Sequence, residues 1–414
     1  MSAARTYEAK ELTVVEHEFS LPLDHSRPDG VRIGVFAREV AAPGGLDRPF
    51  LVYFQGGPGF EASRPTVSPP DPPWLPRAVA EYRVLLLDQR GTGRSTPIGA
   101  LPGLTASEQA EHLAHFRADS IVRDAESIRR ELGVERWSVL GQSFGGFCVI
   151  TYLSAAPSGL REAFVAGGLP PIGLHTDEVY RRTYPRVLER NRRYYERYPG
   201  DRERVIAIHR LAEAEEIVLP CGDVLTPRMF RQLGLMLGMS DGAERLHYLL
   251  ELPPTSPAFL HDVEAALPFP RNPIFAVIHE ACYADGCTTG WSAERLRPAE
   301  FDSPELFTGE HIYSWMFEDY KALRPLRDAA HLLATRQWPR LYEPGQLAQN
   351  DVPTAAVVYT NDMYVDRALS EGTVDRVRNL RVWATDEYEH NGLIADGQRV
   401  LDHLIGLVRT EPVA

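Results

Sequence analysis

The chain has 414 residues, which exceeds the roughly 250–300 residues at which a single hydrophobic core usually stops growing. We therefore expect either a main domain with a large insertion or two domains. The apolar fraction of 44% is ordinary for a globular protein. The formal net charge of −13, with no basic face evident in the sequence, argues against a general nucleic-acid binder and suits a substrate that carries a positive amine.

Signals for export and membrane insertion do not appear in the sequence pattern. Arg5, Glu8 and Glu11 interrupt any apolar signal core, and no stretch approaches the roughly 18 apolar residues of a transmembrane helix. The cysteines have neither paired metal-ligand spacing nor the density of a disulfide framework, and a reduced state is expected even for the two that lie close in sequence. They are Cys148, Cys221, Cys282 and Cys287. We expect a cytoplasmic protein that uses no metal or other cofactor and does not associate with membranes.

Strand patterns dominate the first part of the chain. Residues 12–15, 31–37 and 50–54 are expected strands, and the last of them runs into the glycine-rich loop Gln55-Gly56-Gly57-Pro58-Gly59. Residues 83–87 form a continuous apolar run, which is typical of a parallel strand covered on both faces. The sequence Asp88-Gln89-Arg90-Gly91-Thr92-Gly93 follows; because it lacks the third glycine and the lysine of phosphate loops, we predict a structural role for it.

The most informative motif is Gly141-Gln142-Ser143-Phe144-Gly145-Gly146. It follows an expected strand at 137–140 and precedes an apolar helical run. Before that strand, residues 118–132 have the periodic apolar pattern of another helix. A serine between glycines at a strand-to-helix turn is the nucleophile elbow of the α/β-hydrolases. The turn is strained, and the start of the helix supplies a backbone donor and a favourable dipole for an oxyanion. We therefore predict Ser143 as the nucleophile.

A second match to the same pattern occurs at Gly238-Met239-Ser240-Asp241-Gly242. The residues before it, 229–237, have the pattern of a helix and not of a strand. An aspartate directly after the serine would also place negative charge where the oxyanion must form. We interpret Ser240 as a helix end or turn.

From about residue 172 to residue 340 helical, charged patterns replace the strand patterns. Strands are expected on either side of this region, at 163–168, 354–359 and 380–383, and a closing amphipathic helix at 400–408. The sequence thus predicts an α/β fold: a mostly parallel, doubly wound sheet formed by residues 1–171 and 341–414, with a helical cap domain inserted at 172–340.

The acid and the base of a catalytic triad are expected after Ser143 in the chain, in that order. Asp362 lies just past the strand 354–359, at the sheet edge where ligands bind in such folds, and Asp366 is the alternative. His390 follows the strand 380–383 and precedes a glycine, whereas His403 falls within the final helix. In this arrangement His390 would accept the serine proton and later protonate the leaving group, while Asp362 would fix its tautomer.

The glycine-rich loop after the strand 50–54 occupies the position of the second oxyanion donor in this fold. We expect Gly56 and Gly57 to form the oxyanion hole together with the backbone N–H of Phe144. An ordinary tight turn is the alternative interpretation of this loop.

Taken together, these motifs resemble the proline iminopeptidases, which are serine peptidases of the α/β-hydrolase fold. The segments at 55–59, 88–95 and 141–146 match in order and spacing, and those at 361–365, 389–392 and 308–317 extend the match over most of the chain. Smaller members commonly carry histidine where this chain has Gln55, so the resemblance is closer to the longer branch. The resemblance implies release of N-terminal proline from peptides through an acyl-enzyme intermediate.

In this family carboxylates of the cap hold the free amine of the substrate, and Glu280 and Glu310 are the candidates here. Two other functions remain open. The first is an α/β-hydrolase with the same triad that acts on other esters or amides, and the second is a catalytically silent binding protein. The complete set of Ser143, Asp362 and His390 argues against the silent protein, and only the cap separates the two enzymes. The sequence does not indicate an oligomeric state.

Overall fold

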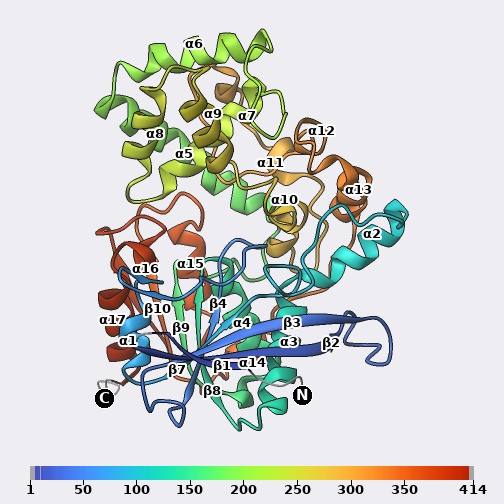
Figure 1. Ribbon diagram of the computed structural model, residues 1–414, viewed down its shortest axis with the longest axis vertical. Helices are drawn as coiled ribbons and strands as arrows, with labels where there is room; N and C mark the ends of the chain where they lie inside the picture. The colour runs from blue at the N-terminus through green and yellow to red at the C-terminus, as the bar shows by residue number, and fades with distance from the viewer. Residues whose placement is uncertain (1–4, 10, 410–414) are drawn as a thin grey trace.

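The computed structural model describes residues 5–9 and 11–409, which form a nine-stranded mixed sheet covered by helices, with a helical part stacked on one end (Figure 1). The strand order is β1-β2-β3-β7-β4-β8-β9-β10-β11. Strands β1, β2, β3 and β7 pair antiparallel, and all pairs from β7 to β11 are parallel. This arrangement confirms the predicted α/β class with a mostly parallel sheet.

The strands of the large sheet lie close to the predicted positions. Only β1 was not expected, and the strand expected at 163–168 begins and ends earlier, at Leu160–Ala166. Their bounds are β1 Arg5–Ala9, β2 Leu12–Pro22, β3 Arg32–Ala41, β4 Phe50–Phe54, β7 Arg83–Leu87, β8 Trp137–Gln142, β9 Leu160–Ala166, β10 Thr354–Tyr359 and β11 Leu380–Thr385. A separate hairpin pairs β5 Thr66–Val67 with β6 Pro70–Asp71.

Helices cover both faces of the sheet because successive strand residues point to opposite sides. In β4, Val52 and Phe54 belong to the hydrophobic cluster that includes α3 Ala118–Glu131 and α4 Phe144–Ala155. Leu51 and Tyr53 belong to a second cluster on the other face, with α1 Leu75–Val79 and α17 Gly397–Arg409. The sheet is thus doubly wound, as the apolar runs predicted.

The described residues between β9 and β10 form helices and loops, apart from one isolated bridge between Val218 and Val224. The larger helices here are α5 Thr176–Arg197, α6 Asp201–Glu213, α8 Gly242–Leu250, α9 Pro257–Ala266 and α13 Arg327–Thr335. Shorter ones are α7 Pro227–Arg231, the 3₁₀ helix η3 Gln232–Gly238, α10 Pro273–Ile278, α11 Ser292–Arg295 and α12 Met316–Asp319. They lie above the sheet (Figure 1). The division of the chain at 172 and 340 stays a prediction, and residues 1–4, 10 and 410–414 of the flanking segments lie outside the described part.

Four further α-helices complete those that the described residues form. They are α2 Ala106–Leu113, α14 Pro344–Leu347, α15 Arg367–Val374 and α16 Gly392–Ala395. Of these, α2 lies beside α13 and not against the sheet (Figure 1).

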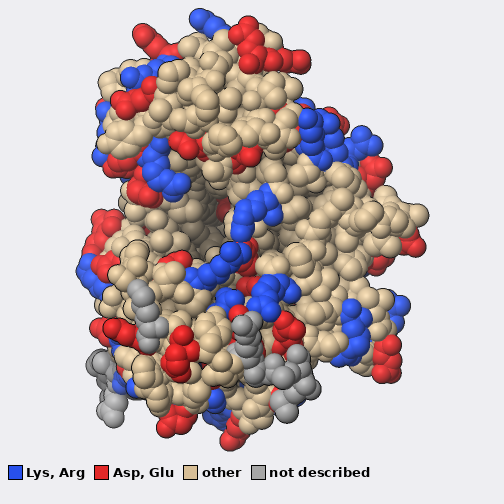
Figure 2. All heavy atoms as spheres, in the orientation of Figure 1, with Lys and Arg blue, Asp and Glu red and all other residues tan. Residues whose placement is uncertain are grey.

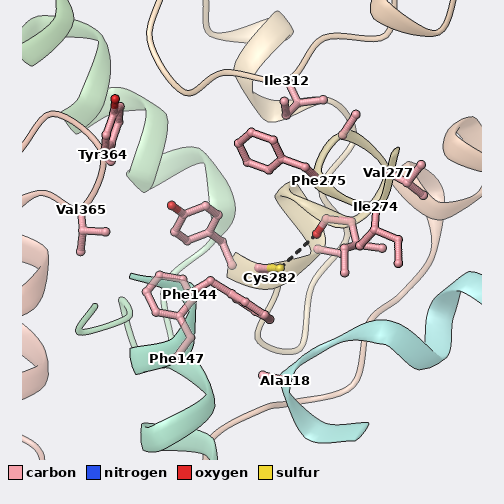
Figure 3. Close-up of a cluster of buried hydrophobic side chains, with 14 of the residues drawn as sticks. Ala118, Phe144, Phe147, Ile274, Phe275, Val277, Cys282, Ile312, Tyr364 and Val365 are labelled. Carbon is pink, nitrogen blue, oxygen red and sulfur yellow. Dashed lines mark hydrogen bonds between the residues drawn. The ribbon is translucent and has the colours of Figure 1, made fainter. Parts of the chain in front are cut away.

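Apolar side chains join the helical part to the helix that begins after Ser143. Figure 3 shows Phe144 and Phe147 of α4 facing the segment that carries Phe275 and Cys282. The ring of Phe147 lies 5.3 Å from that of Tyr283 in an edge-to-face contact, a favoured aromatic geometry. The helical part is therefore seated directly over the elbow.

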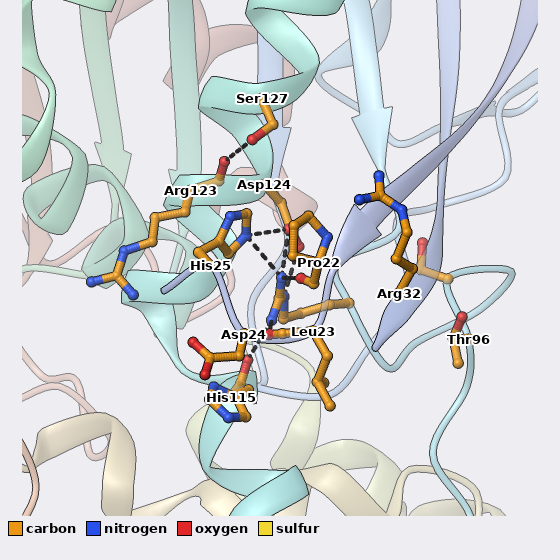
Figure 4. Close-up of polar contacts among 12 residues, drawn as sticks. Pro22, Leu23, Asp24, His25, Arg32, Thr96, His115, Arg123, Asp124 and Ser127 are labelled. Carbon is orange, nitrogen blue, oxygen red and sulfur yellow. Dashed lines mark hydrogen bonds and ion pairs between the residues drawn. The ribbon is translucent and has the colours of Figure 1, made fainter. Parts of the chain in front are cut away.

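The segment that follows β7 has a structural role, as its sequence predicted. The Arg90 side chain is fully buried and donates to the Asp124 carboxylate and to the backbone oxygens of Leu23 and His115. His25 contacts the same carboxylate at 2.8 Å, in the polar cluster drawn in Figure 4. Gln89 donates to the backbone oxygen of Gln55 at 3.0 Å, so this segment also supports the glycine-rich loop.

None of the helices in the described part of the chain is long and apolar enough to cross a membrane.

Candidate active site

Ser143 lies in the sharp turn between β8 and α4. Its backbone has φ 52° and ψ −124°, a conformation that is strained for a residue with a side chain. The turn is held by hydrogen bonds from the Ser143 N–H to Ala166 and from the Gly146 N–H to Ser143, at 2.9 and 2.7 Å. A Cβ on Gly145 would lie only 2.0 Å from the Phe54 oxygen, so glycine is required there. The strain presents the Ser143 side chain above the carboxyl edge of the sheet.

His390 and Asp362 come together from two loops at that edge. His390 Nδ1 lies 2.6 Å from Asp362 Oδ2, and Asp362 Oδ1 accepts hydrogen bonds from the N–H groups of Tyr364 and Val365 at 2.8 and 3.1 Å. Since the carboxylate can only accept, Nδ1 carries a proton and Nε2 is left free to act as a base. This is the geometry expected of a histidine whose tautomer is fixed by an acid.

Opposing effects act on the His390 ring. Burial disfavours its charged form, but the negative charge of Asp362, their hydrogen bond and the charge of Glu310 outweigh burial. The pKa of His390 is therefore raised above the ordinary value for histidine. The site stabilises the imidazolium that a general base forms when it takes a proton.

Asp366 and Ser240, the two alternatives, have other partners. Asp366 caps α15 by accepting from the Ala368 and Leu369 N–H groups, and it pairs with Arg186. Ser240 lies in the turn between η3 and α8, as expected, and its N–H and Oγ both donate to Asn391 Oδ1 at 2.8 Å.

The glycine-rich loop lies beside the elbow. A Cβ on Gly56 would approach the Ser143 Cβ to 3.2 Å, so the two backbones are close neighbours. Gly57 has φ +116°, which a residue with a side chain rarely adopts. Phe144 is the first residue of α4, where backbone N–H groups have no partner within the helix.

A pocket of about 270 Å³ opens over these residues, where the molecule is hollowed between its helical and sheet parts (Figure 2). Ser143, His390, Gly56, Gly57 and Glu310 all contribute to its lining. The rest of the wall is mostly apolar and comes from both parts of the chain. It comprises Gln55, Phe60, Gln142, Leu235, Met239, Pro268, Phe275, Tyr364 and Ile394.

The two glutamates proposed for amine binding are placed differently. Glu310 lines the pocket, and no side chain or backbone N–H of the described residues donates to its carboxylate. Desolvation raises the pKa of Glu310 to about 8; the charge of His390 acts in the opposite direction, and the charge of Asp362 adds to the rise. Glu280 does not line this pocket; its carboxylate accepts from the N–H groups of Ser292 and Ala293 at 3.1 and 2.8 Å. Burial raises the pKa of Glu280 to about 7, against those two hydrogen bonds.

Sequence reasoning missed several residues of this region. Phe60 directly follows the glycine-rich loop, but the pattern gives no sign that its ring lines the pocket beside Phe275, at a ring distance of 5.3 Å. Arg190, in a stretch dense in arginine and glutamate, reaches the loops that carry the acid and the histidine. Across the described residues, no group of three or more histidine, cysteine or acidic side chains could hold a metal ion.

Comparison with known proteins identifies relatives of the chain and of its fold. The family model for the alpha/beta hydrolase fold matches residues 49–205. A proline iminopeptidase of Aeromonas sobria is 47% identical over 429 aligned residues, which cover 99% of this chain and 100% of that protein. Another, from Aspergillus aculeatus, is 35% identical and covers 95% of this chain and 93% of the relative.

Among solved structures, the 2-hydroxy-6-oxo-6-phenylhexa-2,4-dienoate hydrolase of Rhodococcus sp. strain RHA1 matches 96% of this chain and 100% of its own, with a TM-score of 0.50. Its sequence identity is 13%, so this likeness shows the fold alone.

Proposed function

The chain belongs to the proline iminopeptidase family, and we propose that it is a serine aminopeptidase that releases N-terminal proline from peptides. The observation that carries this proposal is the position of Glu310. Its carboxylate, to which none of the described residues donates, stands in the wall of the same pocket that contains Ser143 and His390. An esterase that acts on uncharged substrates does not need a carboxylate in its pocket, whereas an aminopeptidase must bind a free, positively charged amine.

The acylation step follows from the roles assigned to the triad. His390 Nε2 takes the proton of the Ser143 hydroxyl as the oxygen attacks the carbonyl carbon of the N-terminal residue. The N–H of Phe144 and an N–H of the Gly56-Gly57 loop donate to the oxyanion that forms. His390 then gives its proton to the leaving amine, the peptide departs, and the prolyl group remains as an ester on Ser143.

Deacylation repeats the chemistry with water as the nucleophile. His390 removes a proton from water, the hydroxide oxygen attacks the ester, and the proton returns to Ser143 as proline leaves. Asp362 stabilises the imidazolium in both halves through the 2.6 Å contact with Nδ1. Its two backbone hydrogen bonds keep the carboxylate oriented while the histidine charges.

Recognition of the substrate combines charge with shape. The protonated proline nitrogen would donate to the Glu310 carboxylate, in a charge-assisted hydrogen bond that is stronger than a neutral one. The apolar walls of Phe60, Phe275 and Tyr364 suit the hydrocarbon part of a proline ring. Glu280, held by two backbone donors, is the weaker candidate for the amine.

A panel of chromogenic substrates tests this function. We expect rapid hydrolysis of proline arylamide, slower hydrolysis of alanine arylamide and none of N-acetylproline arylamide, which has no cation for Glu310. Simple esters of uncharged acids serve as the comparison for triad chemistry without amine recognition. Equal rates on N-acetylproline and proline arylamide would instead make the protein a hydrolase of other esters or amides.

We also propose a cytoplasmic location. All four cysteines fall within the described residues and each is free, which suits a reducing compartment. Fractionation of the source cells with antibody detection tests this proposal, and recovery in an oxidising compartment would contradict it.

A further inference from the structure

Arg190 connects the cap helix α5 to both loops that carry the acid and the histidine. Its Nη2 donates to the backbone oxygen of Asn361 at 2.7 Å and forms an ion pair with the carboxylate of Glu389. Asn361 directly precedes Asp362, and Glu389 directly precedes His390. One guanidinium therefore touches the neighbour of each member of the catalytic pair.

The arrangement matters because the two loops follow different strands. Asp362 comes after β10 and His390 after β11, yet the contact between their side chains is only 2.6 Å. A small shift of either loop would lengthen that contact and turn the imidazole ring. The Arg190 side chain is 13% exposed, so its bonds to both loops are largely shielded from water.

A second set of contacts from the cap supports the same loops. The N–H of His390 donates to the Gly238 oxygen at 3.1 Å, and the hydroxyl of Tyr364 donates to the Leu235 oxygen. The Tyr364 ring meets the His390 ring edge to face at 4.8 Å. The second match to the elbow pattern thus forms a turn, 238–242, that supports the histidine loop.

We propose that Arg190 is a positioning residue, which holds the loops of Asp362 and His390 in their relative positions. Because Arg190 lies on α5, it thereby couples the position of the cap to the geometry of the triad. This inference rests on the proposed triad and not on the proposed preference for proline. Arg190 acts through its neighbours and does not line the pocket.

Substitutions of Arg190 test the proposal, with Arg186 as the matched control. Arg186 lies one turn earlier on α5 and also forms an ion pair with a loop residue, Asp366, but it contacts neither neighbour of the catalytic pair. We expect Arg190→Met to lower kcat roughly 10- to 100-fold, since small misplacements of catalytic groups cost about that much, with little change in KM. Arg190→Lys should recover part of the loss, and Arg186→Gln should stay within about twofold of the wild type.

Two readouts separate positioning from general destabilisation. The proton in the short bond between His390 and Asp362 should give a far-downfield NMR resonance, present in the wild type and Arg186→Gln but weakened or lost in Arg190→Met. Kinetics should be measured both on proline arylamide and on an uncharged ester, and the fractional loss of kcat should be equal on the two. The ester result stands even if proline arylamide proves a poor substrate.

Several outcomes would overturn the inference: an unchanged downfield resonance in Arg190→Met, a loss confined to KM, a loss no larger than that of Arg186→Gln, or a loss seen only with the amide. If Arg190→Met fails to fold, Arg190→Lys and Arg190→Gln provide the same comparison.

Discussion

Replacing Glu310 with glutamine tests the assignment of the amine site most sharply. The substitution keeps the size of the side chain and its ability to accept a hydrogen bond, but it removes the negative charge. Glu280→Gln is the matched control, because Glu280 is a buried glutamate of the same insertion whose carboxylate already has two backbone donors. If the amine binds at Glu310, only the first substitution should affect amine recognition.

The expected size of the effect follows from the environment of the carboxylate. Hydrogen bonds to charged groups contribute about 1.5–3 kcal/mol, and each 1.4 kcal/mol is a factor of about ten, so kcat/KM should fall roughly 10- to 150-fold. No described residue donates to Glu310, so no internal hydrogen bond must be broken before the substrate binds. The loss should therefore lie within this range once Glu310 is charged, above its pKa of about 8.

The assay compares kcat/KM on proline arylamide with kcat/KM on an uncharged ester for each variant at pH 8. Glu310→Gln should lose activity on the amide and keep it on the ester, while thermal unfolding checks that each variant is folded. Parallel losses on both substrates would mean damage to the triad or the fold. A loss in Glu280→Gln without one in Glu310→Gln would refute the assignment and move the amine site to Glu280.

The triad and the pH profile give three further predictions. Ser143→Ala should abolish turnover with an unchanged fold, whereas Ser240→Ala, which removes only a hydroxyl that bonds Asn391 and the Glu389 N–H beside His390, should keep turnover with at most a positioning loss like that of Arg190→Met. The reverse result in steady-state rates would overturn the elbow assignment. Asp362→Asn should lower kcat by roughly 10⁴-fold, by analogy with the serine-protease triad. Asp366→Asn should mainly lower the melting temperature, because it weakens the N-terminal cap of α15. Equal losses of kcat in the two variants would remove Asp362 from the triad. The ratio of kcat/KM on the amide to kcat/KM on the ester should rise from pH 6 to pH 8, because the charged fraction of Glu310, whose pKa is about 8, increases over this range. An equal rise of this ratio in Glu310→Gln would assign the titration to another group.

The sheet and the elbow could be predicted because local sequence determines them. The apolar run 84–87 is typical of a strand buried on both faces, and the glycines around Ser143 are required by contacts as close as the 2.0 Å approach at Gly145. The order of Asp362 and His390 after strands placed them at one edge, where the structure has them in contact. The signals for these features lie within short segments of the chain.

The cap could be predicted only as a helical region. The sequence does not distinguish Glu280 from Glu310 as the amine-binding residue. Whether a carboxylate accepts from backbone N–H groups depends on contacts with distant residues such as Ser292, which periodicity does not reveal. Arg190 belongs to a helix dense in charged residues, most of whose charged side chains reach solvent, and its partners Asn361 and Glu389 lie 171 and 199 positions away. Pairings at that separation are set by the packing of the whole chain.

Trapping the acyl-enzyme tests the central claim directly. Wild-type protein mixed with a proline ester and quenched in acid should carry a prolyl adduct, and peptide mass spectrometry should place it on Ser143. The adduct should be absent from Ser143→Ala and should form more slowly with N-acetylproline ester, which has no cation for Glu310. An adduct on the peptide that contains Ser240, or none under rapid turnover, would contradict the account.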